Sequence, residues 1–445
     1  MNNVKEFGAK GDGITKDTAA IQRAIDAGGM VCFPPGIYLS GSLYLKSNGG
    51  LYLEPGAILL ASPDKEDYNA DDFCPQNRVF ASEAVSGAHF INAVEQENIV
   101  ICGGGRIDGN RQNIFGTKTE PDCEYHEGKF DRSAPDFWRP AQMLFICECR
   151  NVQIRDVQLY NAPYWTCFLH GCEDVQVHGV RILNDQFTPN GDGIDVDCCC
   201  RVTISDCIID SGDDCITLRG HVDPLKKARA CEFVTITNCI LHTNCNGFRI
   251  GVGNGIVRNV TVSNIVFHHC RTAISINSNY STNPERGVEI SNISFHNLQI
   301  EAVRAILINC QVRGSTPEPP AKDIRNIRIQ QVRGTVQKPN MICGSAGLGM
   351  YDITLKDIVL DIANDLESSG NHAGPWGEWT AGNPECVFYV SHADGIVFDH
   401  VKVNWKKPVS GWTYGILAYN CKTIEQEKVS LGRPDLNETP DDTVK

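Results

Sequence analysis

Short runs in which apolar and polar residues alternate recur along most of this chain. Their first residues stand at positions 98, 151, 174, 201, 233, 259, 292, 326, 352 and 395, as in NVQIRDVQL from Asn151 and FVTITNCIL from Phe233. Within a run, apolar residues occupy positions i and i+2, a period of two that predicts β-strands. A polar residue or a glycine then interrupts the run, so each unit predicts a strand, a turn and a second strand.

These runs form a repeat. From Val152 to Val260 the first apolar residues fall at positions 152, 175, 202, 234 and 260, which gives spacings of 23 to 32 residues. A unit this short cannot bury its own apolar face, whereas stacking on its neighbours buries it. The repeat therefore predicts an all-β fold, a parallel β-helix. The alternative, a β-propeller, would need blades of about 40 to 50 residues with Trp or Gly-His signatures, and the sequence has neither.

The stack needs a cover at its open end, and residues 15–29 (TKDTAAIQRAIDAGG) predict a short capping helix. Asp17 is the expected N-cap, Gly28 the expected stop, and Ile21, Ala24 and Ile25 share one apolar face. We expect one β-helix domain over residues 1–445. Insertions at about 110–140 and 364–386 interrupt the repeat and are expected to form loops on the binding face, where Trp376 and Trp379 could stack on sugar rings.

Composition narrows the possible partners and the compartment. The net charge of −14, without a basic run, excludes a nucleic-acid binder, and no apolar run approaches the roughly 18 residues of a membrane span. The 21 cysteines often fall at strand-like positions, and the N-terminal sequence MNNVKEFGAKGDG lacks the pattern of a signal peptide. We therefore expect buried, reduced thiols in a cytoplasmic protein. Cys198, Cys199 and Cys200 point to alternating faces and do not predict a metal cluster, so no metal or cofactor is expected.

The segment SGDDCITLRG, residues 211–220, places two adjacent aspartates before an apolar strand. Burying two like charges side by side is costly, so the presence of Asp213 and Asp214 suggests that they have a functional role. Asp192, in PNGDGIDVD, precedes Asp213 by 21 residues, close to one coil. We therefore expect three carboxylates to share one patch on an exposed groove. Aspartates in glycine-rich turns often only accept backbone N–H groups. That interpretation is adequate for Asp195, Asp197, Asp206 and Asp210, but explains the doublet less well.

The pair of motifs NGDG (190–193) and GDD (212–214) on such a repeat resembles the polygalacturonase family, the pectin-degrading glycoside hydrolases of family 28. FGAKGDG near the N-terminus, FPPGIYLSGSLYLKSN (33–48), Arg139-Pro140 and the NAPYW segment ending at Trp165 are also similar. The resemblance extends from about residue 4 to about 310. It implies a right-handed parallel β-helix and hydrolysis with inversion. Asp213 would then be the general acid, and Asp192 and Asp214 would activate water.

Two family motifs are altered in this chain. The Gly-His-Gly turn of the family corresponds to Cys245-Asn246-Gly247, and the Arg-Ile-Lys motif that binds the galacturonate carboxylate corresponds to Ser275-Ile276-Asn277. Both cationic groups are lost, which puts ordinary polygalacturonase activity in doubt. The predicted substrate-binding residues are the following: Asn246, Arg249, Arg219, His221, Asn277, Arg271 and Trp165.

The leading hypothesis is an exo-acting, inverting glycoside hydrolase without a cofactor, which acts on a pectin-related plant oligosaccharide other than plain polygalacturonate. One alternative is a β-helix that binds carbohydrate without turnover, since the histidine and the cations are lost. Another is a Ca²⁺-dependent polysaccharide lyase, for which Asp195 and Asp197 could be ligands. The sugar, the linkage and the oligomeric state are not predicted.

Overall fold

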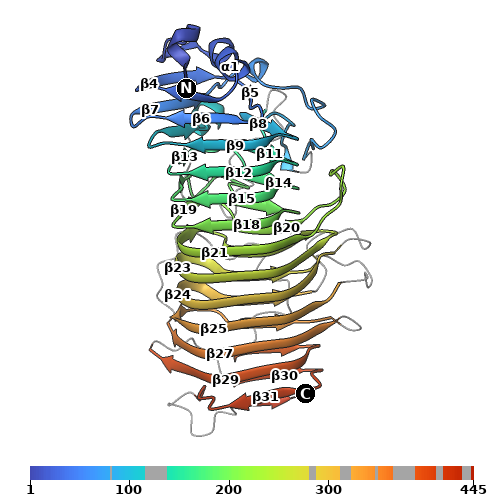
Figure 1. Cartoon of the computed structure of the whole chain (residues 1–445). Helices are drawn as coiled ribbons and strands as arrows, with labels where there is room; N and C mark the ends of the chain where they lie inside the picture. The colour runs from blue at the N-terminus through green and yellow to red at the C-terminus, as the bar shows by residue number, and fades with distance from the viewer. Residues whose placement is uncertain are drawn as a thin grey trace. The chain divides into compact units, whose positions relative to one another are not determined.

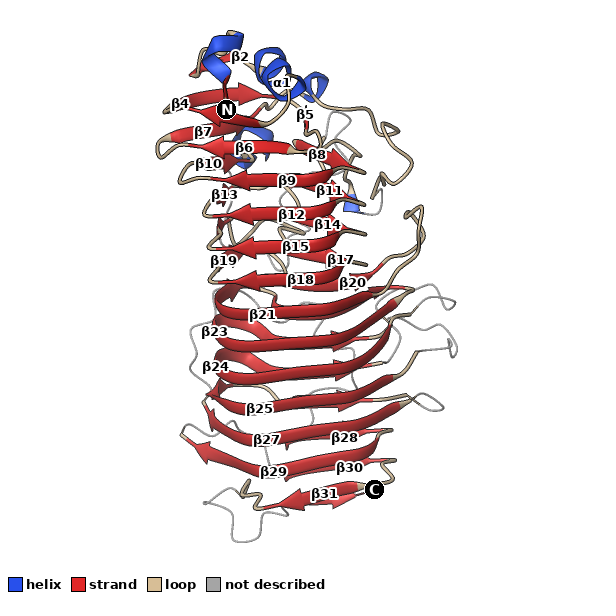
Figure 2. Ribbon diagram, in the orientation of Figure 1, coloured by secondary structure: helices blue, strands red, loops and turns tan. Residues whose placement is uncertain are grey.

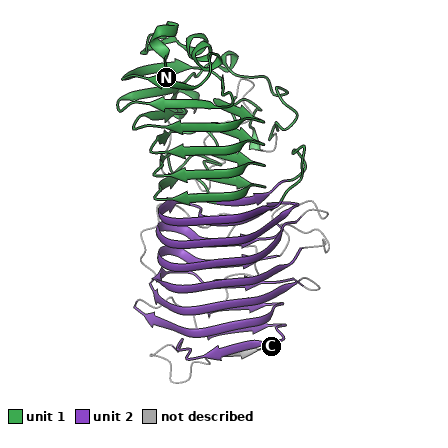
Figure 3. Ribbon diagram, in the orientation of Figure 1, with its two compact units in different colours: residues 1–216, 222–229 green, residues 217–221, 230–445 purple. Residues whose placement is uncertain are grey.

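The computed structural model describes residues 1–80, 83–115, 138–279, 287–310, 322–345, 349–363, 386–406, 414–432 and 442–444. These residues form the predicted right-handed parallel β-helix, with few helices (Figures 1 and 2). The chain divides into two compact units (Figure 3), residues 1–216 with 222–229 and residues 217–221 with 230–445. The single domain over 1–445 stays a prediction. Most of the first insertion and nearly all of the second, with Trp376 and Trp379, lie outside the described residues.

In the first unit, each coil adds strands to three parallel columns. The first column is β1 (Asn2–Asn3), β3 (Met30–Phe33), β6 (Gly49–Leu53), β9 (Glu97–Cys102), β12 (Arg150–Arg155), β15 (Glu173–His178) and β18 (Cys200–Ser205). The second is β2 (Asp12–Lys16), β4 (Gly36–Ser40), β7 (Ala57–Ala61), β10 (Arg106–Asp108), β13 (Gln158–Tyr160), β16 (Arg181–Leu183) and β19 (Ile208–Ser211). The third is β5 (Leu43–Tyr44), β8 (Ile91–Val94), β11 (Leu144–Cys147), β14 (Cys167–His170) and β17 (Ile194–Asp197).

The second unit is built from longer parallel strands. One series is β21 (Cys231–Thr243), β23 (Ile256–Asn277), β24 (Glu289–Asn309), β25 (Ile324–Val336), β27 (Met350–Ile362), β29 (Asp394–Trp405) and β31 (Ile424–Glu427). The shorter strands are β22 (Asn246–Gly253), β26 (Asn340–Cys343), β28 (Cys386–Ser391), β30 (Tyr414–Tyr419) and β32 (Asp442–Val444). The boundary between the units falls within β20 (Ile216–Gly220).

The apolar repeat forms the core, as the alternation predicts. Val152 pairs with Val175 and Val175 with Val202, and each of these side chains is at most 1% exposed. The second unit has a column of its own, formed by Val234, Val260, Ile293, Ile327, Ile353 and Ile396. Burying a side chain of this size contributes roughly 1.5 to 3 kcal/mol. The period-two pattern therefore supplies one continuous apolar column in each unit.

The first residue of each run has a left-handed backbone. In the first unit, φ is +57° at Asn98 and +54° at Asn151. Asn151 Nδ2 donates to Asn98 Oδ1 at 2.8 Å, so the amides form a ladder along the stack. In the second unit Asn292 donates to Asn259 and Asn326 donates to Asn292 in the same way. Asn and Asp tolerate the left-handed region better than most residues, which explains why most runs open on a polar residue.

Phe233 opens its run with a large apolar residue instead of a polar one, and we expect that replacing it stabilises the protein. Its φ is +56° and its side chain is 54% exposed, opposite Asn259 in the ladder. Phe233→Asn is expected to stabilise the protein by about 1 kcal/mol, because the left-handed conformation costs a bulky residue more than Asn. Chemical denaturation measures the change. Val266→Asn is the control, since Val266 is 41% exposed and φ is not positive there. Equal effects of both changes would contradict this explanation.

The predicted capping helix is present as α1 (Thr18–Asp26), next to the 3-10 helix η1 (Val4–Phe7). Its buried residues include the predicted Ile21, Ala24 and Ile25. The predicted capping bond differs, because the Asp17 carboxylate accepts from the backbone N–H groups of Lys10 and Gly11 at 2.7 and 2.9 Å. Asp17 therefore ties the preceding loop to the helix. The remaining helices are η2 (Lys65–Asp67) and α2 (Arg111–Phe115), and no helix among the described residues is long and apolar enough to cross a membrane.

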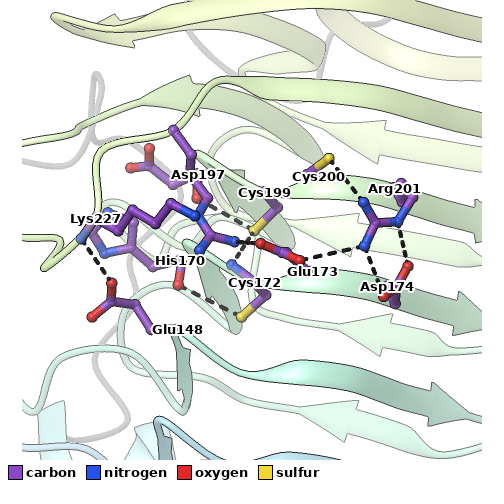
Figure 4. Close-up of polar contacts among 11 residues, drawn as sticks. Glu148, His170, Cys172, Glu173, Asp174, Asp197, Cys199, Cys200, Arg201 and Lys227 are labelled. Carbon is purple, nitrogen blue, oxygen red and sulfur yellow. Dashed lines mark hydrogen bonds and ion pairs between the residues drawn. The ribbon is translucent and has the colours of Figure 1, made fainter.

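The cysteines of the described residues are free thiols, and most are buried. Several of them make a turn contact that Figure 4 shows for one case. Cys199 Sγ donates to the carbonyl of Asp197, two residues earlier, at 3.3 Å. It also lies 3.2 Å from the carbonyl of Leu169. Cys172 contacts His170 and Ile146 in the same way. Burial raises the pKa of the Cys172 thiol well above its usual value. These contacts fit reduced thiols that satisfy turn carbonyls. The cytoplasmic location stays a prediction.

Candidate active site

The two aspartate motifs lie on neighbouring coils of the first unit. Asp192 precedes β17, and Asp213-Asp214 follow β19. The Gly193 N–H donates to the Asp214 carbonyl at 2.9 Å, and the Gly212 N–H donates to the Gly191 carbonyl at 3.1 Å. Equivalent positions on hydrogen-bonded parallel strands lie about 4.8 Å apart. The expected stacking of Asp192 beside the doublet is therefore present, whereas the catalytic roles of the three residues stay predictions.

Glycines make this close stacking possible. A Cβ atom on Gly193 would lie 2.4 Å from the Cys215 carbonyl oxygen. A Cβ atom on Gly212 would lie 2.4 Å from the Thr188 carbonyl oxygen. Both distances are far shorter than real Cβ contacts, and the neighbouring atoms belong to the backbone. The glycines that flank the aspartates in NGDG and GDD are therefore needed for the two coils to approach each other.

The three aspartates are more buried than the sequence predicted. Asp192 is 2% exposed, Asp213 is 5% exposed and Asp214 is fully buried. The expectation of an open groove is wrong for Asp214 and holds for only a small part of the other two side chains. The physical reason is the stacking itself, because each coil covers the turn of the next. Small residual exposure at Asp192 and Asp213 leaves these two as the carboxylates that solvent reaches directly.

Arg139 holds the loop that leads to Asp192. Its guanidinium is 1% exposed and donates from Nη1 to the Pro189 carbonyl at 2.9 Å and from Nη2 to Asn190 Oδ1 at 3.2 Å. It also stacks over the Tyr164 ring, 4.9 Å from the centroid. From the sequence, Arg139-Pro140 is only a segment similar to the family, and no role is predicted for it. Its buried partners identify Arg139 as a positioning residue for the first aspartate motif.

Trp165 occupies a different environment from the one predicted. It is 3% exposed and belongs to an aromatic cluster, stacked on Tyr164 with ring centroids 4.9 Å apart and edge-on to Phe168 at 5.2 Å. An indole packed on both sides offers little surface to a sugar ring. This position does not support substrate binding by Trp165, and its backbone carbonyl instead accepts from the Met143 N–H at 2.9 Å.

The other predicted binding residues belong to the second unit, beginning with Arg219 and His221 at its N-terminal segment. Arg219 is buried and His221 half-buried. Asn246 and Arg249 lie in β22, where Arg249 stands between the fully buried Phe248 and Ile250. Strand alternation therefore turns Arg249 to the outer face, opposite the core.

Asn277 and Asn246 lie at opposite ends of the β22–β23 pairing. Asn277 is opposite Gly251, and Asn246 is opposite Thr272. Both asparagines are buried, at 4% and 7% exposure. Thr272 pairs in turn with Arg304 of β24. Asn246 in β22, Thr272 in β23 and Arg304 in β24 therefore occupy the same register position on three successive strands.

Arg304 belongs to a group of three cations that we call the cationic cluster: Arg271, Arg304 and Lys338. Arg304 is 7% exposed, and its Nε donates to the Pro339 carbonyl at 2.8 Å. Lys338 is tied to the same coil, since its N–H donates to the Val303 carbonyl at 2.8 Å. Burial, together with the smaller effect of the Arg271 charge, lowers the pKa of Arg304 to about 10. Burial, Arg304 and Arg271 also lower the pKa of Lys338.

Two members of the cationic cluster have limited access to solvent, since Arg304 is buried and Lys338 is half-buried. Among the described residues, no carboxylate pairs with Arg304 or with Lys338. Of its members, sequence reasoning named only Arg271. Arg304 and Lys338 lie 33 and 67 residues beyond Arg271, so only the stacking of coils brings the three together. A buried cation without an internal counter-ion is well suited to receive an anionic group from outside.

Asp195 and Asp197 were the possible Ca²⁺ ligands of the lyase hypothesis. Both are fully buried in β17. Asp197 has ligand atoms within 4.8 Å of those of His170 and Cys198 (Figure 4 shows His170 and Asp197). An imidazole and a thiol are poor ligands for Ca²⁺, which takes six to eight oxygens. This neighbourhood does not favour a calcium site at Asp197.

Comparison with known proteins identifies relatives over most of the chain. The family model described as "Glycosyl hydrolases family 28" matches residues 76–373, and the one described as "Rhamnogalacturonase A/epimerase, pectate lyase-like" matches residues 1–52. A "Probable polygalacturonase" of Vitis vinifera is 29% identical over 49% of this chain and 44% of its own length. An "Exo-poly-alpha-D-galacturonosidase" of Dickeya chrysanthemi is 26% identical over 75% of this chain and 62% of its own length. The matches thus span less than two thirds of either relative.

The fold is shared with solved structures as well. The family 28 exopolygalacturonase of Yersinia enterocolitica aligns with 97% of this chain and 79% of its own, at a TM-score of 0.70 and 20% identity. That identity supports the β-helix fold alone. The match of the family model is the stronger finding, because it covers well over half of the 445 residues and both aspartate motifs. This chain therefore belongs to the glycosyl hydrolases of family 28.

Proposed function

We propose that this chain is an inverting, exo-acting glycoside hydrolase for an acidic, pectin-related oligosaccharide other than plain polygalacturonate. The observation that carries the proposal is the stacking of Asp192 on Asp213-Asp214 through the backbone bonds of Gly193 and Gly212. Membership of the family supports the hydrolase class. The finer statements on mode of action and substrate rest on a named relative and on residues of the second unit.

In this proposal Asp213 protonates the glycosidic oxygen, and Asp192 and Asp214 activate the water on the other face of the sugar. An inverting enzyme needs an acid and a base that are about 6.5 to 9.5 Å apart, which leaves room for that water. Three carboxylates in one buried patch disfavour a fully ionised state, and the proposal requires that Asp213 carries the proton. Arg139 contributes by fixing the loop before Asp192.

The proposed substrate rests on two features of the second unit. Two motif residues of the family are replaced in it, and it contains the cationic cluster. Asn246 and Asn277 stand where the family has a histidine and a lysine, so a carboxylate would not be bound in the family's usual way. The cationic cluster supplies positive charge elsewhere in this unit, and it fits a carboxylate-bearing sugar. The exo mode is supported by the Dickeya chrysanthemi relative, which is named as an exo-acting enzyme. We expect an oligosaccharide that carries its acidic group at another position than homogalacturonan does.

The test is a time course of product formation on a panel of pectic oligosaccharides, followed by proton NMR. An inverting enzyme produces the anomer opposite to that of the cleaved bond before mutarotation equalises the two forms. An exo enzyme releases one small product throughout the reaction. We expect the inverted anomer, with one small product from an acidic branched or mixed oligosaccharide and a slower reaction on polygalacturonate. Retention of configuration, or an unsaturated product absorbing in the ultraviolet, would refute the proposal.

A further inference from the structure

Three histidines and a glutamate gather on the outer surface of the second unit. They are His242 in β21, His268 and His269 in β23, and Glu301 in β24, three successive strands of the stack. His242 and His268 are partners in the parallel register. These four residues take no part in the proposed hydrolysis, and the sequence predicted no metal site.

A β-bulge brings two adjacent histidines to the same side. Phe267 pairs with Ile300 and Cys270 pairs with Ala302, so His268 and His269 together stand opposite the single residue Glu301. His269 has φ of +50°, the left-handed conformation that such an extra residue often requires. Neighbouring residues of a regular strand point to opposite faces, but here the two imidazole centroids are 4.2 Å apart. The bulge therefore turns both rings towards the same carboxylate.

The distances within the cluster suit a metal ion better than direct hydrogen bonds. His268 Nδ1 lies 3.4 Å from Glu301 Oε2, and His269 Nδ1 lies 3.5 Å from Glu301 Oε1. Strong hydrogen bonds are shorter, with donor and acceptor 2.7 to 3.2 Å apart. Ligands at about 2.0 Å from a tetrahedral ion lie about 3.3 Å from each other, which is close to both separations. The ligand atoms of these three residues also lie within 4.8 Å of one another.

His242 stands at the edge of the cluster, outside the group of ligand atoms that lie within 4.8 Å of one another. Its ring centroid lies 5.4 Å from that of His268 and 6.2 Å from that of His269. The side chains of His268, His269 and Glu301 are 50%, 30% and 39% exposed, so an ion reaches them from solvent. Three imidazoles with one carboxylate are a donor set for borderline transition metals, whereas Ca²⁺ and Mg²⁺ require oxygen ligands.

We propose that His242, His268, His269 and Glu301 form a surface binding site for a divalent transition metal ion of the Zn²⁺ class. The ion connects three successive coils of the second unit. Because these coils separate when the chain unfolds, a bound ion stabilises the folded state by mass action. The site is independent of the hydrolytic residues, so its presence does not depend on the proposed function.

The test uses the untagged full chain, stripped of metal, and isothermal titration with Zn²⁺ in a buffer that does not bind it. Thermal unfolding with and without Zn²⁺ gives a second readout. We expect a site of about one ion per chain, a higher melting temperature with Zn²⁺, and no comparable effect of Ca²⁺ or Mg²⁺. His268→Gln and Glu301→Gln should each weaken binding at this site at least tenfold and remove the thermal shift.

The matched control is His178→Gln, an exposed histidine of the first unit whose Nδ1 lies 3.3 Å from the single carboxylate of Asp206. Zinc binding to thiols elsewhere is common to all variants, so only the difference between variants reports on this site. The variants must unfold at the same temperature as the parent without metal, which separates binding from misfolding. Equal zinc binding and equal thermal shifts in the parent, His268→Gln and Glu301→Gln would overturn the proposal.

Discussion

Asp213→Asn is expected to lower hydrolysis by about a thousandfold or more, since a general acid contributes roughly 10²- to 10⁴-fold and Asn has no proton to deliver. The amide has nearly the volume of the carboxyl, so the 5% exposed side chain keeps its place between the coils. Because the proposal keeps Asp213 protonated, the neutral amide leaves the charge of the group unchanged, and the melting temperature should be nearly unchanged. The measurement is release of product from the best substrate of the panel, together with thermal unfolding.

Asp206→Asn is the control for this experiment. Asp206 lies in the same coil, with φ of +58°, a conformation that Asn adopts equally well. Its side chain is 48% exposed, and we place it outside the catalytic group. The control should keep nearly full activity. If Asp213→Asn also keeps full activity, the assignment of the general acid fails, and with it the proposed mechanism.

Arg304→Met is expected to raise the KM for an acidic oligosaccharide by roughly ten- to a hundredfold, because a hydrogen bond to a charged group contributes about 1.5 to 3 kcal/mol. The same change should leave the protein as stable or make it more stable. Arg304 is 7% exposed and has no carboxylate partner among the described residues, so its burial is costly. Apolar side chains often replace buried charges without loss of stability. A binding role thus predicts a loss of affinity without a loss of stability.

Kinetics on an acidic substrate and on its carboxyl-reduced analogue separate the two effects of Arg304→Met. The reduced substrate should bind the parent and the variant equally. Arg258→Met is the control, since Arg258 is an exposed arginine of the same unit that pairs with Glu232 Oε2 at 2.7 Å. A large fall in melting temperature with unchanged KM would show that Arg304 is structural. That result would remove the cationic cluster from the substrate proposal and leave the role of Asp213 intact.

The stacking of the aspartates could be predicted because it depends on the repeat length. A separation of 21 residues between Asp192 and Asp213 is close to one coil, and stacked coils place equivalent residues side by side. The depth of their burial could not be predicted in the same way, because it depends on how closely the neighbouring coils cover the turn. Trp165 illustrates the same limit, because the surrounding sequence does not reveal that the rings of Tyr164 and Phe168 pack against its indole.

The alternation of apolar and polar residues by itself determined the strands, the parallel β-helix and the core positions, because a period of two admits one inward face. The polar residues that open each run determined the turns, because Asn and Asp accept a left-handed backbone. Only the tertiary structure decided the cationic cluster and the histidine site. Arg271, Arg304 and Lys338 come from neighbouring coils, and Glu301 meets two histidines through a single bulge. The coils differ in length, so the sequence spacing alone does not show which residues of neighbouring coils face each other. The strand register decides this, and the register depends on how the strands pack.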